Sequence, residues 1–79
     1  MTDNDLQTLR QNYNRIVRIR TYDGEVLLAK IFFVSETEQD FTYDLVSTSK
    51  ESQYEKHDKQ PLYLMKFNDV ESVEAANLA

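Results

Sequence analysis

The sequence predicts a small all-β domain with an N-terminal helix, in which five short strands form a strongly bent antiparallel barrel. A polar segment with helical spacing of its leucines is followed by five short runs typical of strands. Asp23-Gly24 joins the first two runs, and Gly24 is the only glycine in the chain. A tight hairpin turn needs a positive φ, which glycine adopts without strain. Two of the runs are apolar on both faces, and a bent barrel is one way of covering both.

We expect the helix over about residues 3–13. Thr2 or Asp3 can cap its first turn, where acidic residues suit the helix dipole. One apolar stripe recurs at three- and four-residue spacing: Leu6, Leu9 and Tyr13. A short helix with such a stripe is stable only when the stripe packs on another part of the fold.

The barrel is expected over about residues 15–75. Alternation in the first strand predicts one face formed by Val17, Ile19 and Thr21. The second strand, residues 26–34, is apolar on both faces: Leu27, Ala29, Ile31 and Phe33 on one, and Val26, Leu28, Phe32 and Val34 on the other. Both faces of this strand should therefore be covered.

The remaining strands are expected over residues 41–46, 62–67 and 70–73. Residues 47–60 are polar and lack periodicity, which predicts a long loop between the third and fourth strands. Pro61 is tolerated at the start of the fourth strand, and Asn68-Asp69 turns the chain into the fifth. All 79 residues are expected to form one domain.

The composition excludes several classes of protein. No cysteine is present and only one histidine, so disulfides and a structural metal site are not expected, and we expect no cofactor. A core this small favours self-association as a source of stability. The start of the chain is acidic, and its longest apolar run is far shorter than the roughly 20 residues of a membrane helix, so we expect no membrane contact and a cytoplasmic location.

Three sequence features are shared with a known family. The helical leucines Leu6 and Leu9 precede residues 17–24, which fit the spacing of a V-x-V-x-L-x-D-G pattern. A small residue, Ala29, follows five positions after the glycine, and the apolar Ile31 follows two positions later. Residues 65–73 have the spacing of an I-R-G-x-x-V-x-x-I pattern. In these features the chain resembles the Sm-like proteins, the family that includes Sm, LSm and Hfq.

The resemblance implies an Sm-like fold and a homo-oligomeric ring, in which the fourth strand of one subunit pairs with the fifth strand of the next. It also implies binding of single-stranded RNA at the inner rim. Where the family binds a flipped base through an aspartate and an asparagine four residues apart, this chain has Ser35 and Gln39. Where the family has an arginine-glycine pair, this chain has Lys66-Phe67.

The candidate RNA-binding residues are thus Gln39, Lys66 and Ser35, together with Tyr43, which can stack on a base. Tyr43 also alternates with Phe41 and Leu45, as a core residue would. Gln39 and Lys66 are equally compatible with ordinary polar positions at a loop and a strand end.

The alternatives remain open. A net charge of −5 argues against indiscriminate nucleic-acid binding, and most of the acidic residues follow residue 34. A protein-interaction module without nucleic acid, for example a ribosome-associated barrel, would use the acidic surface and the long loop. Arg15, Arg18 and Arg20 can follow a phosphate backbone or bond to local carboxylates. His57 lies beside carboxylates in the long loop, where solvation is the ordinary outcome. No nucleophile or glycine-rich motif points to an enzyme.

Overall fold

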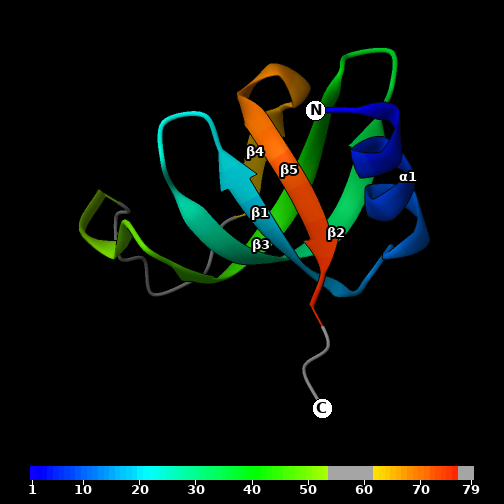
Figure 1. The fold of residues 1–79 in the computed structure, drawn as a ribbon. Helices are drawn as coiled ribbons and strands as arrows, with labels where there is room; N and C mark the ends of the chain where they lie inside the picture. The colour runs from blue at the N-terminus through cyan, green and yellow to red at the C-terminus, as the bar shows by residue number, and fades with distance from the viewer. Residues whose placement is uncertain (54–61, 77–79) are drawn as a thin grey trace.

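The computed structural model describes residues 1–53 and 62–76 of the chain. The helix α1 (Asp3–Gln11) is followed by the strands β1 (Ile16–Thr21), β2 (Val26–Ser35) and β3 (Asp40–Thr48), the 3₁₀ turn η1 (Glu51–Gln53), the strand β4 (Tyr63–Lys66), the 3₁₀ turn η2 (Phe67–Asp69) and the strand β5 (Val70–Ala75) (Figure 1). The N-terminal helix and the five strands follow the predicted order.

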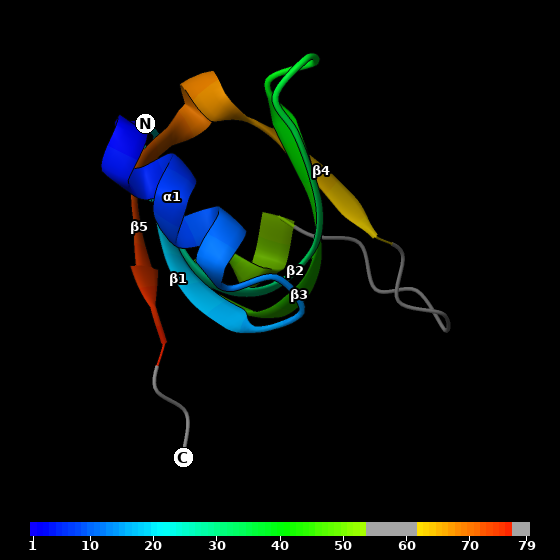
Figure 2. The same cartoon turned by 90° about the vertical axis from the view of Figure 1, so that its right-hand side faces the viewer.

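The five strands form one antiparallel sheet in the order β4-β3-β2-β1-β5. The sheet curls so that β4 and β5 face each other from opposite sides, with η2 crossing between them (Figure 2). These two edge strands do not pair with each other, so the sheet stays open. The mostly-β class and the five antiparallel strands are therefore confirmed, whereas a closed barrel is not.

The core lies on the concave face of this sheet. As predicted, Val17, Ile19 and Thr21 of β1 are buried, and Arg18 and Arg20 between them are exposed. The other buried apolar residues are Leu9, Leu27, Ala29, Ile31, Phe41, Tyr43, Met65, Val70 and Val73. Of these, Leu9 comes from α1, which packs mainly against β5 and also against β2.

A bulge in β2 overturns the predicted placement of Phe33. The pairing with β3 shifts register between Ile31 and Phe33, so an extra residue, Phe32, interrupts the alternation. Phe33 consequently turns outward and is 57% exposed, whereas Val34 packs against the core. Strict alternation along the sequence cannot anticipate this change of face.

The helix begins as predicted but ends earlier. Thr2 is the N-cap, and it forms a capping box with Asp5. The helix stops at Gln11 rather than near residue 13, and Asn14 then takes a φ of 62° while its N–H donates to the Ile31 carbonyl at 2.7 Å. Tyr13 therefore lies outside the helix, 46% exposed, and does not extend the apolar stripe.

The Asp23-Gly24 turn has the predicted backbone. Gly24 has a φ of +92°, and its N–H donates to the Thr21 carbonyl at 3.1 Å. The Thr21 hydroxyl donates to the Asp23 carboxylate, and the Glu25 N–H donates to the same carboxylate at 3.3 Å. Across the turn, Lys50 Nζ lies 3.4 Å from Asp23 Oδ2.

The later boundaries differ from those expected. Strand β3 is longer than predicted and includes Ser47 and Thr48, and β5 continues to Ala75 because it pairs with β1 along that strand's length. Strand β4 is shorter than residues 62–67. Half of the predicted 47–60 loop, residues 54–60 with His57, falls outside the described residues, as does Pro61. No helix in the described part of the chain is long and apolar enough to cross a membrane.

Candidate nucleic-acid interface

The turn between β2 and β3 lies against η2. The Phe67 N–H donates to the Gln39 carbonyl at 2.8 Å, and Asp40 is the cross-strand neighbour of Lys66. Gln39 has a φ of 55°, a left-handed conformation that is uncommon for residues other than glycine. The two loops in which the sequence predicts RNA-binding residues are therefore joined by a backbone hydrogen bond.

Local bonds fix the β2–β3 turn. The Ser35 hydroxyl accepts a hydrogen bond from the Glu38 N–H at 3.2 Å, which organises the turn from within. Glu36 contacts Arg10 of α1 as an ion pair, which connects the turn to the helix. Ser35 thus has a structural partner inside the turn that the sequence did not reveal.

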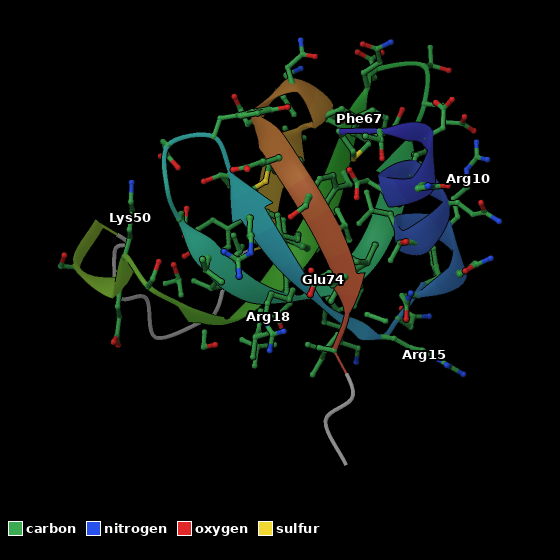
Figure 3. The ribbon with its side chains drawn as sticks, in the orientation of Figure 1. Arg10, Arg15, Arg18, Lys50, Phe67 and Glu74 are labelled. Carbon is green, nitrogen blue, oxygen red and sulfur yellow. The ribbon has the colours of Figure 1, made fainter. Side chains whose placement is uncertain are left out.

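A hollow of about 310 Å³ lies where α1, this turn and η2 meet, which is at the small end of the ~300–1,000 Å³ range of ligand pockets. We call it the N-terminal hollow. Its lining residues are Met1, Thr2, Asp3, Leu6, Glu36, Gln39, Phe67 and Asn68. Figure 3 shows Phe67 beside the start of α1.

The ring of Phe67 gives the N-terminal hollow an aromatic wall. It is half-buried and stacks on Phe41 with ring centroids 6.3 Å apart and an angle of 28° between the planes. A partly buried ring supported from behind by another ring is a suitable platform for a planar ligand. The sequence identified Phe67 only as a departure from a family pattern.

Lys66 does not line the N-terminal hollow. Its Nζ lies 3.7 Å from Oδ2 of the buried Asp40, and its own side chain is 59% exposed. Lys66 is the last residue of the edge strand β4 and directly precedes Phe67, which does line the hollow.

Tyr43 lies in the core. It is 3% exposed, and its ring contacts those of Phe41 and Tyr63 at centroid distances of 5.7 and 5.8 Å. The core alternative for this residue is thus the one that the structure favours, because a ring enclosed by neighbours offers no face to a base.

Arg15 and Arg18 lie away from the N-terminal hollow (Figure 3). Arg18 NH1 is 3.8 Å from Glu74 Oε2 across the β1–β5 pair, and both side chains are exposed. Arg15 and Arg18 are at the opposite end of the sheet from Phe67 (Figure 3). Arg18 therefore follows the local-carboxylate alternative.

No feature of the sequence predicted that three particular polar side chains would lie together at the N-terminal hollow. Within the described residues, the side chains of Asp3, Gln39 and Asn68 make no hydrogen bond or ion pair. Sequence reasoning missed Asp3 and Asn68, because they come from segments 65 residues apart that only the fold brings together. No group of three metal-ligating residues occurs in residues 1–53 and 62–76.

A second hollow, of about 560 Å³, lies on the open side of the sheet between the hairpin tip and β4. Its lining residues are Thr21, Tyr22, Asp23, Glu25, Leu64, Met65 and Asp69. Tyr22 and Leu64 are 66% and 59% exposed, so apolar surface remains uncovered at this opening.

Comparisons of this chain with protein-family models, with curated proteins and with solved structures find no match.

Proposed function

We propose that this chain is a non-enzymatic Sm-like subunit that assembles into a homo-oligomeric ring and binds single-stranded RNA beside the N-terminal hollow. The observation that carries the proposal is the open sheet, in which the edge strands β4 and β5 have no further strand beside them among the described residues and are separated by the short η2 turn. That strand order, with the helix before β1, agrees with the family resemblance of the sequence.

The edge strands have backbone groups to offer a neighbour. The Phe67 N–H points to β3, so by antiparallel alternation the backbone groups of Leu64 and Lys66 point to the free edge of β4. On β5, the Ala76 N–H pairs with the Ile16 carbonyl, which leaves the groups of Ala75 and Val73 outward, and the Val73 N–H is bonded to the Asp5 carboxylate of α1. Unpaired edges of this kind are usually covered in native proteins.

Charge favours joining unlike edges. Lys66 is exposed on β4, whereas Glu71 and Glu74 are exposed on β5. Pairing two β5 strands would bring carboxylates together, and pairing β4 with β5 brings opposite charges together. A contact between unlike surfaces is head-to-tail, and it forms a ring when its rotation closes.

Assembly would also cover apolar side chains. Leu62 and Leu64 are 55% and 59% exposed, and Leu64 borders the hollow on the open side of the sheet. Burying these groups stabilises an interface by about 25 cal/mol per Å² of apolar area. This supports a neighbour's strand as the occupant of the β4 edge.

RNA binding is proposed from the chemistry of the N-terminal hollow. Phe67 offers a stacking face, and the amides of Gln39 and Asn68 can donate to and accept from a base edge. Lys66, at the end of β4, is the nearest candidate for a phosphate.

The test of assembly is the mass in solution of wild type and two variants. Leu64→Lys places a charge at the β4 edge, and Phe33→Lys is the matched control because Phe33 is equally exposed but lies on the internal strand β2. We expect wild type and Phe33→Lys to form the same oligomer at micromolar concentration and Leu64→Lys to be a folded monomer by circular dichroism. A monomeric wild type, or an oligomer unaffected by Leu64→Lys, would contradict the proposal.

RNA binding is tested separately with labelled poly-U and poly-A across a salt series. Affinity at low salt that is no better than that of an unrelated acidic protein would favour the second candidate function, a protein-interaction module. The carboxylates of Asp3 and Glu36 at the N-terminal hollow are the observation that favours this second candidate.

A further inference from the structure

We infer that the N-terminal hollow selects guanine among the four bases, with the Asp3 carboxylate as the acceptor for its Watson–Crick edge. The inference rests on the proposed RNA binding and names the base that this site takes. Two observations support it: which polar side chains at the hollow have no partner among the described residues, and which hydrogen bonds those side chains can accept or donate.

Two carboxylates line the hollow, those of Asp3 and Glu36, and they differ in whether another described residue contacts them. Glu36 is engaged by Arg10 of α1, which holds the acidic turn in place. Asp3 has no partner among the described residues, and its carboxylate is exposed at the first position of the helix. An ionised carboxylate has two acceptor oxygens and no donor, so it binds most strongly to a ligand with two adjacent N–H groups.

Guanine is the base that meets this requirement. Its N1–H and N2–H₂ donors are adjacent on the Watson–Crick edge, so they can bond to both oxygens of one carboxylate. Uracil has a single ring N–H between two carbonyls, and adenine and cytosine each have one amino group beside an acceptor nitrogen. Those acceptors would face the negative charge of Asp3, which disfavours these three bases.

The neighbouring groups complete the match. The O6 acceptor of guanine needs a donor, which the amide of Gln39 or Asn68 can supply. Phe67, which is partly buried and lines the hollow, offers the remaining face of its ring to the base, supported by Phe41 behind it. Phosphates are repelled by the carboxylates, so the base enters the hollow while the backbone stays outside, on the side of Lys66.

The test uses short labelled uridine oligonucleotides that carry one central guanosine, inosine, adenosine, cytidine or uridine. Inosine lacks the N2 amino group and so removes one of the two proposed bonds. The quantity compared is the affinity ratio of each oligonucleotide to the all-uridine one, measured by fluorescence anisotropy with the full chain. Asp3→Asn removes the double acceptor, and Glu51→Gln in η1 is the matched control because it changes the net charge equally at an exposed residue that lines neither the hollow nor the proposed strand edges.

We expect the guanosine oligonucleotide to bind at least about fivefold more tightly than the all-uridine one, the low end of discrimination by a bidentate contact. Inosine should fall between them. Asp3→Asn should bring the ratio close to one, while Glu51→Gln should leave it unchanged and raise all affinities together. An equal ratio for all bases, or a ratio that Asp3→Asn does not change, overturns guanine selection and leaves RNA binding standing.

A further arm separates this inference from the function on which it rests. If no oligonucleotide binds at low salt, the proposed RNA binding fails together with the inference. A labelled arginine-containing peptide, measured in the same way, identifies the other occupant that an acidic hollow with an aromatic wall can take. Binding of that peptide alone, lost in Asp3→Asn, would overturn both proposals in favour of a protein partner.

Discussion

Replacing Asp5 with alanine should destabilise the fold far more than any other substitution in the first turn of α1. One Asp5 oxygen accepts from the Thr2 N–H at 2.9 Å and from the Thr2 hydroxyl at 3.0 Å. The other accepts from the Val73 N–H of β5 at 3.1 Å. This carboxylate therefore closes the helix start and also satisfies the edge strand.

The magnitude follows from these two functions. A buried donor that loses its acceptor costs about 1–3 kcal/mol, and Val73 is 5% exposed. Losing a helix cap costs about 0.5–2 kcal/mol, and the low end applies because Thr2 remains as the N-cap residue. We therefore expect Asp5→Ala to lower the free energy of unfolding by about 2–3 kcal/mol. Asp3→Ala is the control, and it should cost less than about 1 kcal/mol because Asp3 contributes only through the helix dipole.

Urea unfolding followed by circular dichroism measures both variants, with the slope m checked for a change in the unfolded or native state. If Asp5→Ala and Asp3→Ala shift the midpoint equally, the bond to Val73 contributes nothing and the reasoning fails. An unchanged m is needed for the midpoint shift to report stability alone.

The pH dependence gives an independent check. Burial raises the pKa of Asp5, but the hydrogen bonds from Thr2 and Val73 together outweigh it, so the pKa is lowered from the ordinary 3.8. A lowered pKa stabilises the fold above the unfolded value, and that stability is lost as the pH falls through the folded pKa. The stability difference between wild type and Asp5→Asn should therefore be constant at neutral pH and shrink below 3.8. A difference that grows with acidification would contradict this sign.

Two further predictions concern the hairpin tip. Gly24→Ala should lower the free energy of unfolding by about 1–2 kcal/mol through backbone strain alone, because a Cβ at Gly24 meets nothing within 4 Å. Gly24→Asn should cost less. Equal urea midpoints for Gly24→Ala and wild type would exclude such strain. The bond from the Thr21 hydroxyl lowers the pKa of Asp23, with a smaller contribution from the Glu25 N–H. Thr21→Val should therefore raise the pKa of Asp23 toward its ordinary value in an NMR titration, and Thr21→Ser should keep that pKa low. If the pKa of Asp23 does not change in Thr21→Val, another group lowers it.

The strands were predictable where side-chain alternation records which face is buried. Val17, Ile19 and Thr21 alternate with exposed residues, and Asp23-Gly24 marks the turn through a steric requirement on one residue. The boundaries were less predictable, because β5 ends where its partner β1 ends rather than where its own residues change in character. The outward turn of Phe33 depends on a bulge set by pairing with β3, which no local pattern encodes.

The candidate site was predictable in part. The sequence identified Gln39 and the segment at Lys66-Phe67, and the structure brings these two loops together through a backbone hydrogen bond. It did not indicate that Lys66 would pair with Asp40 outside the hollow. It could not place Asp3 opposite Asn68, because contacts between distant segments depend on how the sheet curls.

The start of α1 shows why the charge pattern alone is ambiguous. Asp3 and Asp5 are two residues apart, and this separation places them about 200° apart around the helix axis. Both appear in the sequence as ordinary acidic residues of a first helical turn. Asp5 faces inward, where it is buried and bonded to β5, while Asp3 faces the N-terminal hollow with no partner among the described residues. Asp5 therefore has bonded partners in the fold, whereas Asp3 contributes only through the helix dipole, and Asp3 is the carboxylate to examine for a ligand.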